Sequence, residues 1–182
     1  MKRLCVYCGA SAAGPIYRDA ARDLAQGLVS SGWGLVYGGA SVGLMGVVAD
    51  EVLAAGGSVV GVIPRSLQDR EIAHRGLSEL HVTEDMHERK ALMVSLSDAF
   101  VALPGGWGTL DELCEIITWR QLSLHQKPCG ILNTAGFYDA FFQHLDRMDA
   151  DGFSRFNYRR ELVVTDSPQE VLRQLIQPGQ PG

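Results

Sequence analysis

The chain has 182 residues, of which 46% are hydrophobic, and a formal net charge of −5 with an isoelectric point near 5.5. A chain of this length can bury a core without help from disulfides or metal ions. The acidic balance argues against a nucleic-acid partner, because proteins that bind a phosphate backbone carry a basic face. No apolar run is long enough to span a membrane, and the start, "MKRLCVYCGA", is too short for a signal peptide. We therefore expect a cytoplasmic protein with no membrane or nucleic-acid partner.

Short apolar runs alternate with longer amphipathic ones along the chain, as they do in α/β domains with a parallel sheet. The runs "VVGVI" and "FVAL" are apolar throughout, which is typical of strands covered on both faces. The sequence predicts a doubly wound, mostly parallel sheet with helices on both faces, Rossmann-like, in a single domain over 1–177, with a disordered tail at 178–182. The predicted strands are 3–8, 34–37, 58–63, 80–83, 99–103, 128–132 and 162–165, and the predicted helices are 17–31, 43–55, 84–97, 109–122, 137–150 and 168–176.

Three turns at the carboxyl edge of the predicted sheet carry glycines: "CGASAAG", "YGGASVGLMG" and "PGGWGT". One such turn alone is typical of a tight strand-to-helix connection. Three on one edge favour a phosphate ligand, because glycines let backbone N–H groups approach a phosphate at a helix N-terminus. The chain lacks a G-x-G-x-x-G with its ribose acid and a G-K-[ST], which argues against NAD enzymes, kinases and ATPases. We expect a monophosphate held by backbone amides and by Ser41 or Thr109, within loops that contribute Gly9, Ser11, Gly39, Ser41, Gly43, Met45 and Gly46.

The segment "TEDMHERKALM" places Arg89 and Lys90 inside a predicted helix. Its mixed charges favour an exposed, solvated helix face. One observation points the other way, since the chain contains only three lysines, at positions 2, 90 and 127. The residues alone leave both interpretations open.

The segment "TLDELCE" also supports two interpretations. Thr109 and Glu112 have the spacing of a capping box, in which Thr109 is the N-cap and Glu112 bonds back to its N–H. Asp111, Glu112 and Glu115 nevertheless crowd beside the predicted phosphate loop. Carboxylates there would repel a phosphate unless a cation lies between them or unless they serve a cationic centre. Chemistry that develops positive charge on a sugar meets that requirement.

Other kinds of site find little support in the sequence. The five histidines have no metal-binding spacing, and no G-x-S-x-G elbow is present. Cys5 and Cys8 form a C-x-x-C, but three residues apart on a strand they project to opposite faces, and they could form a redox pair only if the strand ended before Cys8. We expect reduced, structural thiols here and at Cys114 and Cys129. The helix after "PGGWGT" is apolar on most sides, which fits either a core helix or a dimer interface.

At this point "PGGWGTLDE" resembles the P-G-G-x-G-T-x-x-E signature of the lonely-guy family, the cytokinin-activating nucleoside 5′-monophosphate phosphoribohydrolases that are often mislabelled as lysine decarboxylases. The segments "VYCGAS", "YGGASVGLMG", "DMHERK", "TWRQLSLHQKP" and "GFYDAF" are similar to this family in the same order, from residue 5 to about 153. The resemblance implies hydrolysis of the N-glycosidic bond of an adenosine-type 5′-monophosphate, N6-substituted or AMP itself, to free base and ribose 5-phosphate. It implies neither cofactor nor metal, and it implies a homodimer.

The resemblance assigns catalytic roles to Arg89 and Glu112. It places the following residues in the nucleotide site: Glu71, Lys90, Gly105, Gly106, Gly108, Thr109 and Thr118. Glu115, one turn beyond Glu112, is a further candidate. Two rival functions stay open. One is a pyridoxal-phosphate lysine decarboxylase, which needs a Schiff-base lysine, here Lys90 or Lys127. The other is a non-enzymatic nucleotide or cofactor carrier on the same fold.

Overall fold

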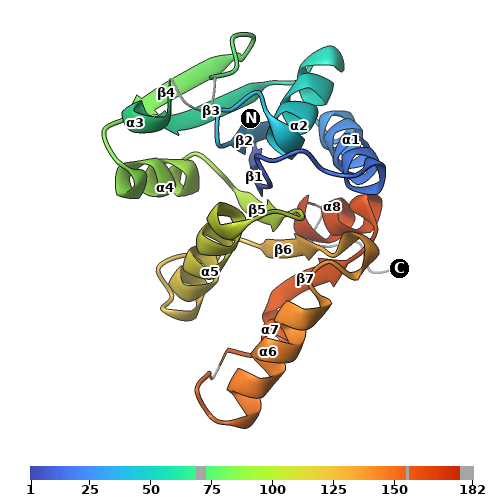
Figure 1. Ribbon diagram of the computed structural model, residues 1–182, viewed down its shortest axis with the longest axis vertical. Helices are drawn as coiled ribbons and strands as arrows, with labels where there is room; N and C mark the ends of the chain where they lie inside the picture. The colour runs from blue at the N-terminus through green and yellow to red at the C-terminus, as the bar shows by residue number, and fades with distance from the viewer. Residues whose placement is uncertain (69–72, 155, 177–182) are drawn as a thin grey trace.

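The structure is a computed structural model that describes residues 1–68, 73–154 and 156–176 (Figure 1). Seven strands form one sheet in the order β4-β3-β2-β1-β5-β6-β7, and every neighbouring pair is parallel. Strand order changes direction between β1 and β5, and in such sheets ligands bind beyond the carboxyl ends of the strands at this switch point. The strands are β1 (Arg3–Tyr7), β2 (Gly34–Tyr37), β3 (Val59–Pro64), β4 (Glu79–Thr83), β5 (Ala99–Ala102), β6 (Cys129–Leu132) and β7 (Leu162–Thr165).

Helices cover both faces of the sheet, and the alternation of side chains along β1 shows how (Figure 1). Leu4 and Val6 belong to one buried cluster, whereas Cys5 and Tyr7 belong to the other. The predicted doubly wound sheet is therefore confirmed. The first cluster is covered by α1 (Pro15–Ser30), α2 (Gly43–Ala54) and α8 (Pro168–Ile176), and the second by α4 (Met86–Ser95), α5 (Trp107–Gln121) and α6 (Asp139–Ala150).

The predicted strands and long helices lie within about two residues of their observed bounds. Three single-turn elements were not predicted, because one turn is too short to show a hydrophobic period: α3 (Arg65–Gln68), the 3-10 turn η1 (Thr134–Gly136) and α7 (Tyr158–Glu161). Helix α5 begins at Trp107, two residues earlier than predicted. None of the helices in the described ranges is long and apolar enough to cross a membrane. The tail predicted at 178–182 lies outside the described residues.

The predicted orientation of Cys5 and Cys8 toward opposite faces of the sheet is confirmed. Cys5 and Cys8 lie in opposite buried clusters, so the C-x-x-C does not bridge, and all four thiols are free. Burial raises the pKa of both the Cys5 and the Cys8 thiol well above the ordinary value, which makes them poor nucleophiles. Cys114 differs from the other three because it is exposed on α5.

A single glycine joins the three loops at the switch point. The Gly9 N–H donates to the Pro104 carbonyl at 3.2 Å, and the Leu44 N–H donates to the Gly9 carbonyl at 2.9 Å. A Cβ at position 9 would lie only 3.2 Å from the Gly105 Cα, so a side chain there would push the first and third loops apart. The loops after β1, β2 and β5 therefore meet at one hydrogen-bonded point.

Candidate active site

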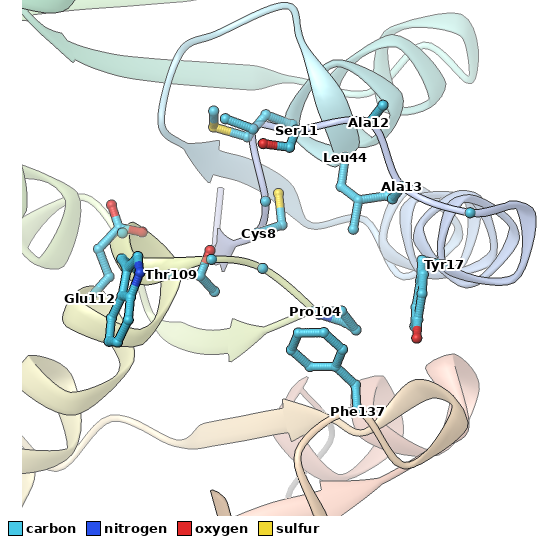
Figure 2. A pocket seen from close by; sticks show the side chains of 18 of the residues that line it. Cys8, Ser11, Ala12, Ala13, Tyr17, Leu44, Pro104, Thr109, Glu112 and Phe137 are labelled. Atoms are coloured by element: carbon cyan, nitrogen blue, oxygen red, sulfur yellow. The ribbon is translucent and has the colours of Figure 1, made fainter.

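A cavity of about 550 Å³ opens at the carboxyl ends of β1 and β5 (Figure 2). Its walls come from the loop after β1, from the starts of α2, α4 and α5, and from Phe137 after η1. Its size and position fit a small-molecule site at the topological switch point. The residues that line it are Cys8, Gly9, Ala10, Ser11, Ala12, Ala13, Gly14, Tyr17, Leu44, Met45, Met86, Arg89, Pro104, Gly105, Gly106, Trp107, Gly108, Thr109, Glu112 and Phe137.

An ion pair between Arg89 of α4 and Glu112 of α5 lies at one end of this cavity. Arg89 Nη1 is 3.2 Å from Glu112 Oε1, and the two side chains are only 8% and 10% exposed. Arg89 Nε also donates to the Val62 carbonyl at 3.0 Å, and Nη2 donates to the Gly38 carbonyl at 3.5 Å. The guanidinium is therefore fixed from the ends of β3 and β2, and it fixes the carboxylate in turn.

Gly38 explains why Arg89 is buried. A Cβ at position 38 would lie 2.4 Å from Arg89 Nη2 and 2.9 Å from Met45 Sδ, so the guanidinium occupies the space that a side chain would fill. The interpretation of this segment as an exposed charged face is wrong for Arg89, which is 6% exposed. The charge pattern along one helix could not reveal that a side chain is absent at Gly38, which follows β2 and is distant in sequence.

Helix α5 begins with open backbone. Its N-cap is Gly106, and within the described residues no side chain caps it and no acid lies in its first turn. A Cβ at Gly106 or Gly108 would meet nothing within 4 Å among described atoms, so the first turn faces free space. Free N–H groups and the helix dipole make such a start favourable for an anion.

The predicted capping box is wrong. Because α5 starts at Trp107, Thr109 lies inside the first turn instead of at the N-cap, and Glu112 pairs with Arg89. Thr109 is 3% exposed, and a Cβ at Gly105 would lie 2.1 Å from its Oγ1. Thr109 thus packs against the glycine loop while its position still lines the cavity.

The starts of α1 and α2 at the cavity have the same character. The N-caps of α1 and α2 are Gly14 and Val42, and in the described ranges neither helix has a side-chain cap or an acid in its first turn. The only charged side chains among the described lining residues are Arg89 and Glu112. A negatively charged ligand therefore meets no carboxylate except the one already paired with arginine.

Cys8 lines the middle of the cavity, so its chemistry needs an answer. Burial, with a further contribution from the Glu112 charge, raises the pKa of this thiol far above neutrality. The thiol is therefore protonated near pH 7 and is not a nucleophile. Within the described residues, no group of three or more His, Cys, Asp or Glu side chains is arranged to hold a metal ion.

The structure brings nine of the predicted site residues together around the cavity: Gly9, Ser11, Met45, Arg89, Gly105, Gly106, Gly108, Thr109 and Glu112. Several predicted glycines support the loops instead of lining the cavity. Gly43 has a φ of +59°, and a Cβ there would lie 2.4 Å from the Ala10 carbonyl carbon; one at Gly46 would lie 2.4 Å from the Ser41 carbonyl oxygen. Gly39 has a φ of +81° and is also outside the lining.

Lys90, Glu115 and Thr118 are not among the described residues that line the cavity. Lys90 Nζ is 3.1 Å from Glu115 Oε1 and 3.2 Å from Asp111 Oδ2. Partial burial lowers the pKa of Lys90, but the hydrogen bonds to the two acids outweigh it, so the pKa is raised overall. A role of these residues in substrate binding stays a prediction. Glu71 lies outside the described residues.

Sequence reasoning did not single out the other end of the cavity, formed by Tyr17, Pro104 and Phe137 (Figure 2). Met86 and Trp107, which also line the cavity, were missed as well. Phe137 stands within the "GFYDAF" segment that carries the family resemblance, which was the one available signal. Tyr17 has no local signal, because the fold alone brings it opposite Phe137.

Comparison with known proteins identifies the family. A family model described as "Possible lysine decarboxylase" matches residues 45–175. The probable cytokinin riboside 5′-monophosphate phosphoribohydrolase LOGL1 of Oryza sativa subsp. japonica is 48% identical over 176 residues, which are 96% of this chain and 79% of that protein. The chain belongs to the lonely-guy (LOG) family. The lonely-guy protein LOG5 of Arabidopsis thaliana, a cytokinin riboside 5′-monophosphate phosphoribohydrolase, is also 48% identical, over 96% of this chain and 77% of its own.

Solved structures agree with the fold of this lonely-guy protein. TM1055 superposes with a TM-score of 0.70 at 27% identity, over 97% of this chain and 99% of that one. The molybdenum cofactor binding protein of Rippkaea orientalis superposes with a TM-score of 0.72 at 24% identity, over 97% and 95%. The second likeness concerns the fold alone. This chain and that protein thus share one fold.

Proposed function

We propose that this lonely-guy protein hydrolyses the N-glycosidic bond of adenosine-type 5′-monophosphates, either N6-substituted ones such as isopentenyl-AMP or AMP itself, to free base and ribose 5-phosphate. Water adds across the bond: its oxygen joins C1′ of the ribose, and the base leaves with a proton. The observation that carries the proposal is the buried Arg89–Glu112 pair beside the open start of α5, in a chain 48% identical to phosphoribohydrolases.

The 5′-phosphate is assigned to the first turn of α5 and the glycine loop before it. The backbone is uncovered at Gly106 and Gly108, and the N-terminal end of the helix dipole favours the negative charge. Phosphate binding here is remote from the bond that breaks, so its binding energy serves to orient the sugar. A nucleoside without phosphate is accordingly a poor substrate.

Glu112 is the carboxylate for the reacting sugar. Departure of the base leaves positive charge on the ribose ring, and a carboxylate held against that charge stabilises the transition state and can accept a proton from the attacking water. Thr109 and Glu112 lie along the same face of the cavity in Figure 2. A phosphate at the start of α5 would therefore place the ribose toward Glu112.

Arg89 positions the Glu112 carboxylate and also lines the cavity. The guanidinium donates to the Val62 and Gly38 carbonyls and to Met86 Sδ, and it pairs with the Glu112 carboxylate, so its plane is fixed. A fixed guanidinium holds the carboxylate in one rotamer, so little reorganisation is needed during the reaction. Its place on the lining also allows a direct contact with the nucleotide.

The rival functions have less support. A pyridoxal-phosphate enzyme needs a lysine at the cofactor, yet among the described lining residues there is none. Lys90 is held by two carboxylates, and Lys127 Nζ donates to the Val94 carbonyl at 2.8 Å. The carrier function rests on likeness to a cofactor-binding protein at 24% identity, whereas the enzymes are 48% identical.

The test is product analysis. Purified protein is incubated with AMP, with N6-isopentenyl AMP and with adenosine, and free base and ribose 5-phosphate are quantified by chromatography. We expect base and sugar phosphate in equal amounts from at least one nucleotide and little from adenosine. Binding of the nucleotides without any base release would favour the carrier, and equal release from adenosine would contradict the phosphate assignment.

We also propose a cytoplasmic homodimer. Apolar side chains stand out at both ends of α5, where Trp107 is 88% exposed and Leu122 is 62% exposed. Exposed large apolar groups on one helix are typical of a surface that a partner covers. Light scattering coupled to size-exclusion chromatography should give twice the mass of the chain, and a monomeric mass at micromolar concentration would contradict the proposal.

A further inference from the structure

The cavity has two chemically different ends on opposite sides of the central glycine loops. Figure 2 shows Glu112 and Thr109 on one side, Cys8 in the middle, and Pro104, Phe137 and Tyr17 on the other side. The proposed substrate ends at its 5′-phosphate. If the ribose faces Glu112, no part of a nucleoside monophosphate extends past the phosphate to the second end.

The second end is a built aromatic wall. The rings of Tyr17 and Phe137 lie 5.9 Å apart, nearly perpendicular at 79°, which is a favourable edge-to-face arrangement. Phe137 is 43% exposed, although the next residue, Tyr138, is only 1% exposed. An aromatic face is therefore held open at the cavity while its chain neighbour is buried.

The turn that carries Phe137 is fixed on both sides. The Tyr138 N–H donates to Asn133 Oδ1 at 2.7 Å, and Asn133 Nδ2 donates to Asp139 Oδ1 at 2.8 Å. The Tyr138 hydroxyl donates to the Leu103 carbonyl at 2.7 Å, which ties the turn to the end of β5. Phe137 thus needs no rearrangement to receive a ligand, and a preorganised wall loses little entropy on binding.

We propose that Tyr17 and Phe137 form a second subsite, which binds a planar group joined to the nucleotide through its phosphate, as in a dinucleoside with a pyrophosphate bridge. This inference rests on the proposed function, because that function sets where the phosphate lies. The bridge would cross between the loop after β1 and the start of α5, where the described lining carries no carboxylate. The planar group would pack on the exposed face of Phe137.

Stacking of a base on an aromatic side chain gives a measurable scale. Alanine substitution at such contacts weakens binding by about 5- to 150-fold. The comparison should isolate the second nucleoside from the bridge. P1,P2-di(adenosine-5′) diphosphate and ADP both contain a pyrophosphate, and only the first carries the second nucleoside. ADP has the larger negative charge, so electrostatics alone favours ADP at a helix N-terminus.

The experiment measures the dissociation constants of these two probes by titration calorimetry on the wild-type protein and on Phe137→Ala, Phe137→Leu and Tyr17→Leu. We expect the dinucleoside to bind wild type at least about 5-fold tighter than ADP, and this ratio to fall toward one in Phe137→Ala. Phe153→Ala is the matched control, because Phe153 is 83% exposed and lies outside the lining; it should keep the wild-type ratio. Melting temperatures establish that each variant is folded.

Two results would overturn the inference. One is a wild-type ratio of one or below. The other is an equal loss of AMP affinity and dinucleoside affinity in Phe137→Ala, which would assign the aromatic end to the base of the substrate itself. Because the readout is binding, it does not depend on turnover: a protein that releases no base from AMP fails the proposed function, while the ratio still decides the subsite.

Discussion

Glu112→Gln separates catalysis from folding at the centre of the site. The amide keeps an oxygen that can accept from Arg89, so the 3.2 Å contact can persist without the charge. If the carboxylate stabilises positive charge on the ribose, we expect kcat for base release to fall by about 100-fold or more, which corresponds to about 2.7 kcal/mol of lost transition-state stabilisation. The KM for AMP should change little, because the phosphate contacts lie on the start of α5.

The cost in stability can be bounded from the same contacts. Removing one partner of a buried ion pair costs about 3–5 kcal/mol when the other charge is left alone. In Glu112→Gln, Arg89 keeps its hydrogen bonds to the carbonyls of Val62 and Gly38 and can donate to the amide oxygen, so we expect the free energy of unfolding to fall by about 1–3 kcal/mol. For a chain of this length, that lowers the melting temperature by about 2–12 °C.

The assay is steady-state base release from AMP at a temperature well below the melting point of both proteins. Glu161→Gln is the matched control, because Glu161 also pairs with an arginine, Arg120 at 3.1 Å, but lies outside the cavity. It should keep turnover within about twofold, as surface pairs contribute little. A folded Glu112→Gln protein with near-normal kcat would reduce Glu112 to a structural partner of Arg89 and refute the reasoning.

Three further predictions concern the loop, the proton and the metal. Gly105→Ala should lower the melting temperature and weaken AMP binding, because its Cβ would lie 2.1 Å from Thr109 Oγ1. Gly106→Ala has open space around its Cβ and should melt like wild type. Equal melting temperatures for wild type and both variants would contradict this account of the packing. Burial lowers the pKa of His125, whose Nδ1 accepts from the Lys127 N–H at 3.1 Å, so the neutral ring is the folded form. The contribution of neutral His125 to stability is complete above about pH 6.5 and is lost as pH falls from there through the lowered folded-state pKa. The free energy of unfolding in urea should therefore decline less between pH 8 and pH 5.5 in His125→Gln than in wild type. An identical decline in the two proteins would refute this. Finally, EDTA should leave base release unchanged, and inhibition reversed by one divalent ion would overturn the metal-free mechanism.

The fold was predictable because its signals are local and repeated. Apolar runs such as "VVGVI" and "FVAL" became central strands buried on both faces, and the glycine turns marked the carboxyl edge. The start of α5 was not predictable from spacing. Thr109 and Glu112 have the spacing of a capping box, but the helix begins directly after the glycine loop, so Gly106 is the N-cap and no side chain caps the helix.

The site was predictable where the family resemblance supplied residues, and less so from physics alone. Charge pattern favoured an exposed Arg89, whereas the missing side chain at Gly38 creates its buried position. Such complementarity joins residues 51 positions apart and leaves no periodic trace. The aromatic end has the same origin, because only the fold brings Tyr17 opposite Phe137.

The hydrogen bonds of Gly9 have a consequence for how this edge of the molecule opens. The Gly9 carbonyl accepts from the Leu44 N–H, and the Gly9 N–H donates to the Pro104 carbonyl. None of the three loops can therefore separate without breaking a hydrogen bond to another. Local opening should then be cooperative, and the amide protons of Gly9 and Leu44 should exchange with solvent as slowly as those of the strands beside them. A loop grafted from a relative into one of these positions would have to bring the other two with it.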